Sequence, residues 1–507
     1  MKITFTRWLC LALVLLMMLP VLAACGDSDQ TDAPTTTAPT AADTTAEPVP
    51  ETTSPYDENG YLRDTLPEDL TFKNGNDPTD FIILGWKHGV PEFEVEAETG
   101  DIVNDAIYQR NRKTEERLGV KLSYEIIPGN SGAFNEYCKT VMTGINANAQ
   151  TYDALACYSR SAGVLTVNRM LIDMLELDYL NFDMPWWSET LVEMNNIHDK
   201  LFFVSGDIAT TTIYQMMLVV YNNTLGTDLG LQNPQKLALE GKWTQEVMFE
   251  MASNVYQDVD NDGQKSIGDQ YGLFSNSHPN LDIFYMGSDM TYVIPDENGD
   301  LSLSSDYFSE KSITVVDRLI NIYKGNDGFF KHSVKIADNN FKSLFYNTSG
   351  ADFSAAFRTS DIEYAILPAP KFDEKQEEYK TCITITYTNF CIPLDAKNPD
   401  MTAAVLECMA SEAYRRTTPA IFETAFKYQY AQSQDDADIF DLIRAGVVFD
   451  LGRTFHDDLG GDGAAPVRKW RTHIENLQNQ LAVSQAMFER LWTKSLANTS
   501  AKLVPEG

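Results

Sequence analysis

Three aspartates alternate with other residues in the stretch DVDNDGQKSIGD, residues 258–269. Their carboxylates can converge on one point only where the backbone turns sharply, and Gly263 permits such a turn. Oxygen ligands in this order and spacing are typical of a bound calcium ion. The six predicted calcium ligands are Asp258, Asp260, Asp262, Gln264, Ser266 and Asp269.

The spacing of this loop resembles that of EF-hand loops, and its last position more nearly resembles dockerin loops. An EF-hand has a bidentate Glu at that position, whereas this chain has the shorter Asp269. The sequence holds no second loop of this kind, so we expect a fixed structural calcium rather than a calcium switch. The alternative is an acidic surface turn that binds no metal.

Aromatic and hydroxyl side chains follow two predicted strands, at the edge where α/β proteins bind ligands. Trp86 ends the run DFIILGW, and Tyr158 and Ser159 end the run YDALACYS. All three are candidate ligand contacts. His88 lies close by, but we expect it to be an ordinary surface or hydrogen-bonded histidine.

Four further candidates come from other segments, and one of them, Asp207, follows Gly206 at a strand end. Trp186 and Trp187 are adjacent, so in an extended segment one ring would enter the core and the other could face a ligand. The sequence does not decide between them, and Trp187 is taken as the candidate. Asp207 can accept hydrogen bonds from two ligand hydroxyls, or it can simply cap a turn. Tyr285 and Tyr387 are weaker candidates, because most such tyrosines pack in the interior.

Motifs typical of enzymes are missing from the sequence. We find no G-x-S-x-G, no H-E-x-x-H, no phosphate-binding P-loop and no GxGxxG after a strand. We therefore expect no catalytic residues. A glycosidase needs only two carboxylates, and 73 acidic residues leave that alternative open.

The N-terminus predicts export. Lys2 and Arg7 precede the apolar run WLCLALVLLMMLPVLAAC, which is too short and wrongly flanked for a membrane span. The end of this run, Leu-Ala-Ala-Cys, resembles the lipobox of bacterial lipoproteins. That resemblance implies a signal peptide at 1–24 and a lipidated Cys25, carrying palmitate-type chains, as the only membrane attachment. The alternative is an ordinary signal peptide with an incidental Cys25.

Residues 25–70 are rich in Thr, Pro, Ala and acidic side chains, and we expect a disordered tether there. The remaining 430 or so residues exceed what one core usually holds, so we expect two lobes. A net charge of -34 argues against a nucleic-acid partner. Five cysteines remain after Cys10 and Cys25; they fit no zinc pattern, and any disulfide among them stays open.

Strands and helices alternate along the chain, which predicts parallel sheets covered by helices. Thr244 is expected to cap a helix, and TCITITYTNFCIPL to form one strand crossing between lobes. WRTHIENLQNQLAVSQAMFERLWTKSL is expected to form one amphipathic helix. Its inward residues would be Ile474, Leu477, Leu481, Met487, Leu491 and Trp492. The expected parts are lobe 1 at 71–216 and 387–455, lobe 2 at 217–386, and C-terminal helices at 456–507 that pack on lobe 2.

Several segments together resemble the extracellular solute-binding proteins of ABC importers, family one. They include NDAIYQRNRKTEERLGV, MPWWSETLVEMNNI, VVYNNTLGTDLGL, GKWTQEVMFEMA and LIRAGVVFDLG, in this order over about residues 65–500. The resemblance implies a periplasmic-binding-protein-like fold of type II. In that fold two α/β lobes are joined by a hinge, with a ligand cleft between them.

The resemblance also implies a function. We expect an extracellular, monomeric receptor, on a Gram-positive cell membrane, that captures a carbohydrate and delivers it to ABC permease subunits. An 11% aromatic content suits sugars, which need flat rings and planar polar groups. The alternatives are a carbohydrate-active hydrolase with paired carboxylates and a calcium-stabilised surface adhesin or scaffold.

Overall fold

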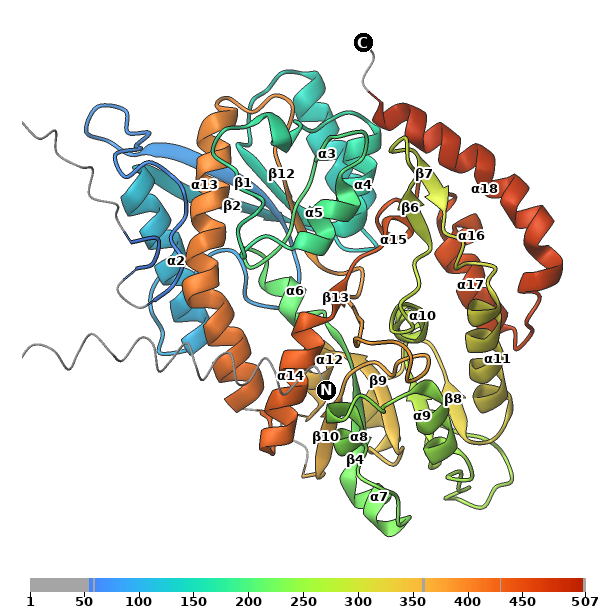
Figure 1. Ribbon diagram of the computed structural model, residues 1–507. Coiled ribbons are helices and arrows are strands. Elements are labelled where there is room, and N and C mark those ends of the chain that lie inside the picture. Colours follow the sequence, from blue (N-terminus) through green and yellow to red (C-terminus); the bar gives the residue numbers. More distant parts are fainter. Residues whose placement is uncertain (1–53, 58–59, 358–360, 429, 505–507) are drawn as a thin grey trace, which may run out of the picture. The chain divides into compact units, whose positions relative to one another are not determined.

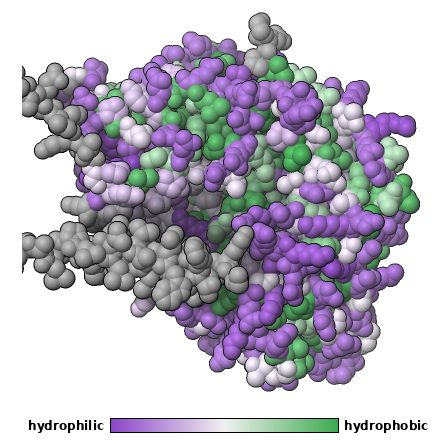
Figure 2. Space-filling view, in the orientation of Figure 1, coloured by the Kyte–Doolittle hydropathy of each residue, from purple (hydrophilic) through white to green (hydrophobic). Residues whose placement is uncertain are grey.

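The structure is a computed structural model that describes residues 54–57, 60–357, 361–428 and 430–504 (Figure 1). It is a mixed α/β fold with two main sheets, as predicted. The signal peptide, Cys25 and most of the predicted tether lie outside the described residues. Hydrophilic residues cover most of the face drawn in Figure 2, with smaller apolar patches between them.

The first sheet has the strand order β12-β3-β1-β2. Its strands are β1 (Thr79–Trp86), β2 (Val120–Ile127), β3 (Ala154–Tyr158) and β12 (Thr388–Cys391). β1 is parallel to both β2 and β3, while β12 returns antiparallel to β3. The intervening helices are α2 (Ile102–Leu118), α3 (Phe134–Asn146) and α4 (Ser159–Val167). The predicted alternation of strands and helices is confirmed in this region.

The second sheet has the strand order β10-β4-β9-β5-β8. Its strands are β4 (Met217–Asn222), β5 (Leu273–Ser275), β8 (Gly328–Phe330), β9 (Phe345–Ser349) and β10 (Tyr364–Leu367). β5 is parallel to β8 and β9, whereas β4 is antiparallel to both of its neighbours. The sheet is therefore mixed. Thr244 caps α9 (Gln245–Ala252) by accepting a hydrogen bond from the Val247 N–H, as predicted.

Three chain segments run between the parts of the fold that hold the two sheets, and they lie side by side. Met216 bridges to Ile383, and β11 (Thr381–Cys382) pairs with β13 (Val447–Val448). We call residues 213–217, 381–387 and 446–450 the crossing segments. The single strand predicted for TCITITYTNFCIPL is wrong, because β11 and β12 are separated by residues 383–387.

The remaining elements complete the description. They are η1 (Met174–Glu176), α5 (Glu189–Asn195), α6 (Thr210–Tyr214), α7 (Asn223–Asp228), α8 (Pro234–Leu239), η2 (His278–Leu281), α10 (Asp282–Met286), β6 (Val293–Pro295), β7 (Leu301–Leu303), α11 (Glu310–Lys324), η3 (Ile336–Asn339), α12 (Gly350–Phe357), α13 (Pro399–Glu412), η4 (Ala413–Thr417), η5 (Ala420–Tyr428), α14 (Gln434–Ala445), α15 (Leu451–Thr454), α16 (Gly461–Ala464), α17 (Pro466–Glu475) and α18 (Leu481–Leu503). α13 continues into the π-helical stretches η4 and η5. None of the helices within the described residues is both long and apolar enough to cross a bilayer.

The C-terminal region differs from the single helix predicted for it. The chain leaves helical geometry after α17, where Leu477 has φ +54°, and α18 begins four residues later. The break changes the phase of the second helix, so Met487 and Leu491 are 62% and 46% exposed rather than inward. α18 packs on β7, which pairs with β6, and also on α4, which follows β3 of the first sheet.

Part of the predicted tether contacts the fold. Leu66 is buried, and the Asp64 carboxylate accepts a hydrogen bond from Arg117 of α2 and pairs with Arg415 of η4. A buried apolar side chain and two ion pairs offset the entropy of ordering these residues. The ordered chain therefore begins before residue 70.

Candidate functional site

A cavity of about 200 Å³ lies against the crossing segments. Two predicted ligand contacts, Trp187 and Asp207, line it together. The full lining is Pro185, Trp186, Trp187, Ser188, Gly206, Asp207, Thr212, Ile213, Met216, Ile383, Arg444, Val447 and Phe449. All three crossing segments contribute to this lining. The cavity thus combines two indoles, hydroxyls, one carboxylate and one guanidinium on an apolar floor.

A close approach of two backbones forms one wall of the cavity. Trp187 and Gly206 form an antiparallel bridge, in which the Asp207 N–H donates to the Trp186 carbonyl at 2.9 Å. A Cβ on Gly206 would lie 2.1 Å from that same carbonyl oxygen. Only glycine fits here. Because Gly206 has no side chain, the two backbones approach closely and Asp207 lies beside the tryptophans.

Asp207 is held by one hydroxyl and lies near one cation. Its Oδ1 accepts a hydrogen bond from the Thr418 hydroxyl at 2.7 Å, and the Arg444 Nη2 lies 3.6 Å away. Burial raises the pKa of the Asp207 carboxyl to about 6, against the opposing effects of Arg444 and Thr418. A carboxylate with one oxygen free of such contacts can accept hydrogen bonds from ligand hydroxyls.

The two tryptophans do not point to opposite sides. Both indole N–H groups donate to the carboxylate of Glu407, Trp186 at 3.1 Å and Trp187 at 2.8 Å. The expectation from extended geometry is therefore wrong, because the segment turns at Met184, whose carbonyl accepts from the Trp187 N–H. Sequence reasoning missed Glu407. Its signal was a lone carboxylate within the apolar run AAVLECMA.

Four other predicted contacts meet at the edge of the first sheet and do not line the cavity; they are as buried as Trp187, which is 3% exposed. Trp86 packs on Tyr158 with ring centroids 5.4 Å apart, and the Ser159 N–H donates to the Tyr387 carbonyl. None of the four exceeds 4% exposure. These side chains contact residues 385–388 and fix them to the first sheet. For example, the Ser159 hydroxyl donates to the Ile385 carbonyl.

A buried polar network lies at this edge, around Thr388 at the start of β12. The Trp86 indole donates to the Thr388 hydroxyl at 2.8 Å, and Thr388 donates to Glu92 at 2.6 Å. His88 pairs with the same carboxylate at 2.7 Å, in keeping with a hydrogen-bonded histidine. Burial opposes the charge of Glu92, yet His88 and the hydroxyl donors hold the carboxyl pKa below its usual value.

Tyr285 lies away from both groups. It is fully buried in α10, stacked on Tyr292 with centroids 4.0 Å apart, and packs edge-on against Trp470. Its hydroxyl donates to the Thr291 carbonyl. The structure thus places Tyr285 in the core beside the second sheet.

A cluster of side-chain hydroxyls on the crossing segments also escaped the sequence reasoning. The Gln215 Oε1 accepts hydrogen bonds from the Thr384 and Thr386 hydroxyls, at 2.5 and 2.8 Å. Gln215 and Thr386 are partly exposed, while Thr384 is buried. The motif TITYT reads as an ordinary strand, so only the pairing of distant segments reveals this polar surface.

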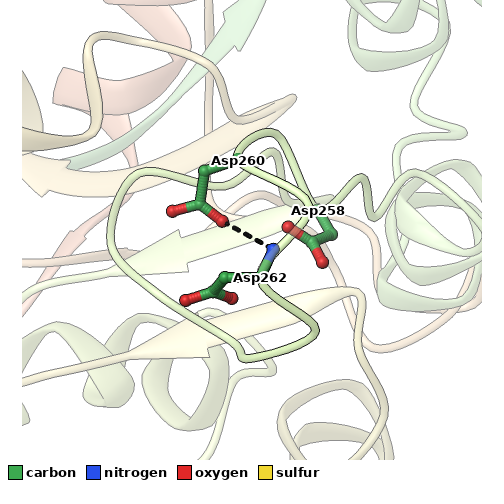
Figure 3. A group of neighbouring side chains, drawn as sticks. All are labelled: Asp258, Asp260 and Asp262. Atoms are coloured by element: carbon green, nitrogen blue, oxygen red, sulfur yellow. Dashed lines mark hydrogen bonds between the residues drawn. The ribbon is translucent and has the colours of Figure 1, made fainter.

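The acidic loop brings three of its six predicted ligands together (Figure 3). Oxygens of Asp258, Asp260 and Asp262 all lie within 4.8 Å of one another, and Gly263 turns the chain with φ +74°. The carboxylates also accept local N–H groups; for example, Asp260 accepts from the Asp262 N–H at 3.2 Å. This arrangement of hard oxygen donors suits a divalent cation.

Asp269 is not part of that group of three. Its carboxylate accepts hydrogen bonds from the N–H groups of Val259 and Ser266, and the Tyr271 hydroxyl lies 3.4 Å away. Asp269 is fully buried, and its carbonyl accepts from Asn339 of η3. Asp269 therefore fixes the loop to the second-sheet region in this structure. The backbone N–H groups of Gln264 and Ser266 donate to Asp262 and Asp269, respectively.

Comparisons with known proteins identify the fold. A scan against family models and a search of curated proteins each found no match. Among solved structures, the galacto-N-biose/lacto-N-biose I-binding protein of the ABC transporter from Bifidobacterium longum has a TM-score of 0.54 at 8% identity. The alignment covers 85% of this chain and 98% of that chain.

Two further sugar-binding proteins are similar in structure. The cyclic alpha-maltosyl-1,6-maltose binding protein from Arthrobacter globiformis has a TM-score of 0.53 at 9% identity, covering 84% of this chain and 99% of that chain. A cyclo/maltodextrin-binding protein complexed with maltotetraose has a TM-score of 0.52 at 11% identity, covering 86% and 100%. The chain has the two-lobed α/β fold of these proteins, as predicted.

Proposed function

We propose that this chain is an extracellular solute-binding protein of family one, which captures a carbohydrate and hands it to the permease of an ABC importer. The observation that carries this proposal is the cavity in which Trp187 and Asp207 meet against all three crossing segments. Ligands of two-lobed proteins bind where the lobes are joined and drive closure of the hinge. The three solved structures of similar fold are named as sugar-binding proteins.

The chemistry of the cavity supports a hydrophilic, uncharged ligand. Indole edges and faces suit the C–H surface of a sugar ring, while Asp207, Ser188 and Thr212 can exchange hydrogen bonds with hydroxyls. Asp207 and Arg444 balance each other's charge. The lining holds a single carboxylate, whereas a glycosidase of the paired-carboxylate type needs two, so binding without catalysis is the better account.

The proposal includes a lipid anchor on Cys25 and a tether that extends from it. The support is the lipobox-like Leu-Ala-Ala-Cys and the apolar-poor stretch that follows. This arrangement would keep a monomeric receptor at the outer face of the membrane, within reach of the permease. Metabolic labelling with an azido-palmitate tests the anchor: label is expected on the wild type and not on Cys25→Ser.

A thermal-shift screen over oligosaccharides tests carbohydrate capture. A ligand that binds only the folded state raises the melting temperature by mass action. The active sugar should lose that effect in Asp207→Asn and keep it in Asp228→Asn, an exposed control aspartate. Release of shorter sugars during incubation would indicate a hydrolase instead, and no shift with any sugar would contradict the proposal.

We also propose that the acidic loop binds one structural calcium ion through Asp258, Asp260 and Asp262. The ion would neutralise three crowded carboxylates and brace a loop already tied to the second-sheet region through Asp269. Chelation should then lower the melting temperature, and calcium should restore it. Calorimetric titration of the apoprotein should give one site, which Asp260→Asn weakens and Asp228→Asn leaves unchanged; an unaltered melt with no heat of binding would refute the site.

A further inference from the structure

Glu407 is a fully buried carboxylate at the centre of α13, between apolar neighbours of the same helix. It accepts hydrogen bonds from three neutral groups: the two cavity indoles, and the Asn181 N–H at 3.3 Å. Within the described residues it takes part in no ion pair with a cation. Burying a charge costs free energy because the charge loses its hydration, and only hydrogen bonds or an ion pair offset that loss.

The two oxygens divide the donors between them. Oε1 accepts from Trp186, and Oε2 accepts from Trp187 and Asn181. An ionised carboxylate has acceptor sites on both oxygens, so it can hold two indoles at once. A glutamine has a donor NH₂ group in place of one of these oxygens, so the indole N–H that faces this group loses its acceptor.

Both indoles line the cavity, and each is also packed from another side. Trp186 lies against Tyr414, with centroids 6.1 Å apart, and Trp187 against Phe182, at 5.6 Å. Trp186 and Trp187 are only 0% and 3% exposed, so packing and two charge-assisted hydrogen bonds restrain the rings together. The shape of the cavity wall thus depends on Glu407, which itself does not line the cavity.

We propose that Glu407 is the positioning residue of the cavity: its carboxylate holds both indole rings in place, so that ligand binding depends on its ionisation. The dependence on ligand rests on the proposed carbohydrate function. The ring-holding role concerns the ligand-free protein and can be tested without any sugar.

Ionisation matters because the carboxyl titrates near neutrality. Burial raises the pKa of Glu407 to about 7, despite the indole donors, and the nearby Asp64 charge raises it further. Asp64 is itself paired with Arg117 of α2 and Arg415 of η4, and Glu412 of the same helix is paired with Arg415 and Arg416. Protonation converts one acceptor oxygen into an O–H donor, which competes with an indole N–H.

The ligand-free test uses nuclear magnetic resonance on protein labelled with ¹⁵N-tryptophan. The variants Trp186→Phe and Trp187→Phe assign the two indole N–H resonances. Both resonances should shift between pH 5.5 and 8.5, with a midpoint near 7. Glu407→Gln should abolish that titration, and the matched control Glu412→Gln on the same helix should keep it. Indole resonances that stay fixed in the wild type, or that still titrate in Glu407→Gln, would overturn the positioning role.

The ligand test measures affinity for the sugar that gives the largest thermal shift. Wild-type affinity should fall as pH drops from 8.5 to 6, and Glu407→Gln should bind about 10-fold more weakly at pH 8.5 with no such fall. Asp228→Asn, the exposed control aspartate, should keep the wild-type pH dependence of affinity, with its midpoint near 7. Equal affinity across the pH range in the wild type would overturn the ligand dependence.

The two proposals fail in different ways. If no carbohydrate binds while both indoles titrate with Glu407, the carbohydrate function is wrong and the ring-holding role stands. If a sugar binds tightly but the indoles ignore Glu407, the function stands and the positioning role is wrong. The wild-type titration needs no variant, so a Glu407→Gln protein that fails to fold does not remove the test.

Discussion

At the residue scale, the chemistry of the cavity depends on a glycine and a glutamate as much as on the side chains that face it. Trp187 and Asp207 were selected for their aromatic and acidic side chains, and both line the cavity. Tyr285 has the same residue type and lies in the core. No sequence pattern separates a tyrosine that faces a cavity from one that stacks on Tyr292.

Gly206→Ala should destabilise the protein by about 1–3 kcal/mol, because the new Cβ would overlap the Trp186 carbonyl. The same change should weaken sugar binding, since Asp207 must move. Gly144→Ala is the matched control: its Cβ would meet nothing within 4 Å, so the helix should be unchanged or slightly more stable. Chemical denaturation of both variants checks this, and equal stabilities would argue against the close approach.

At the element scale, strongly patterned segments were predictable and their interruptions were not. The strands β1, β2 and β3 and the helices between them follow from apolar runs and helical spacing. The gap between β11 and β12 goes with the Met216–Ile383 bridge, and in the break between α17 and α18 the Asn479 side chain donates to the Ile313 carbonyl of α11. The intrinsic preferences of the residues do not reveal such tertiary contacts.

Asp101→Ala should cost about 1 kcal/mol of unfolding free energy by removing the N-cap of α2. The Asp101 carboxylate accepts hydrogen bonds from the N–H groups of Val103 and Asn104. Glu116→Ala, on the exposed face of the same helix, removes only surface ion pairs and should change stability by less than about 0.5 kcal/mol. Urea denaturation of the two variants measures both unfolding free energies. A larger loss of unfolding free energy in Glu116→Ala than in Asp101→Ala would contradict the role of Asp101 as the N-cap.

At the scale of the whole molecule, buried carboxyls link stability to pH. Burial raises the pKa of Asp207 and Asp458 to about 6, and of Glu407 and Asp450 to about 7. Unfolded carboxyls titrate near 4, so between about pH 4 and 7 the folded protein binds more protons than the unfolded chain. Stability contributed by these groups is therefore lost as pH rises through that window.

The melting temperature should accordingly be higher at pH 5 than at pH 7.5, with chelator present at both. Loss of net negative charge on acidification acts in the same direction. Glu475 behaves oppositely: burial opposes its charge, but His278 and Arg468 hold its pKa at about 2, so its contribution fades only below about pH 4.5. Asp450→Asn should reduce the difference between the two pH values. A melting temperature that rises from pH 5 to 7.5 would contradict the assigned shifts.

The proposed function places a carbohydrate in the cavity beside the crossing segments. The most direct measurement is a crystal structure with the sugar that gives the largest thermal shift. We expect a sugar ring against the indole of Trp187 and hydroxyl groups on Asp207. A sugar bound elsewhere on the protein, with this cavity holding only solvent, would contradict the account.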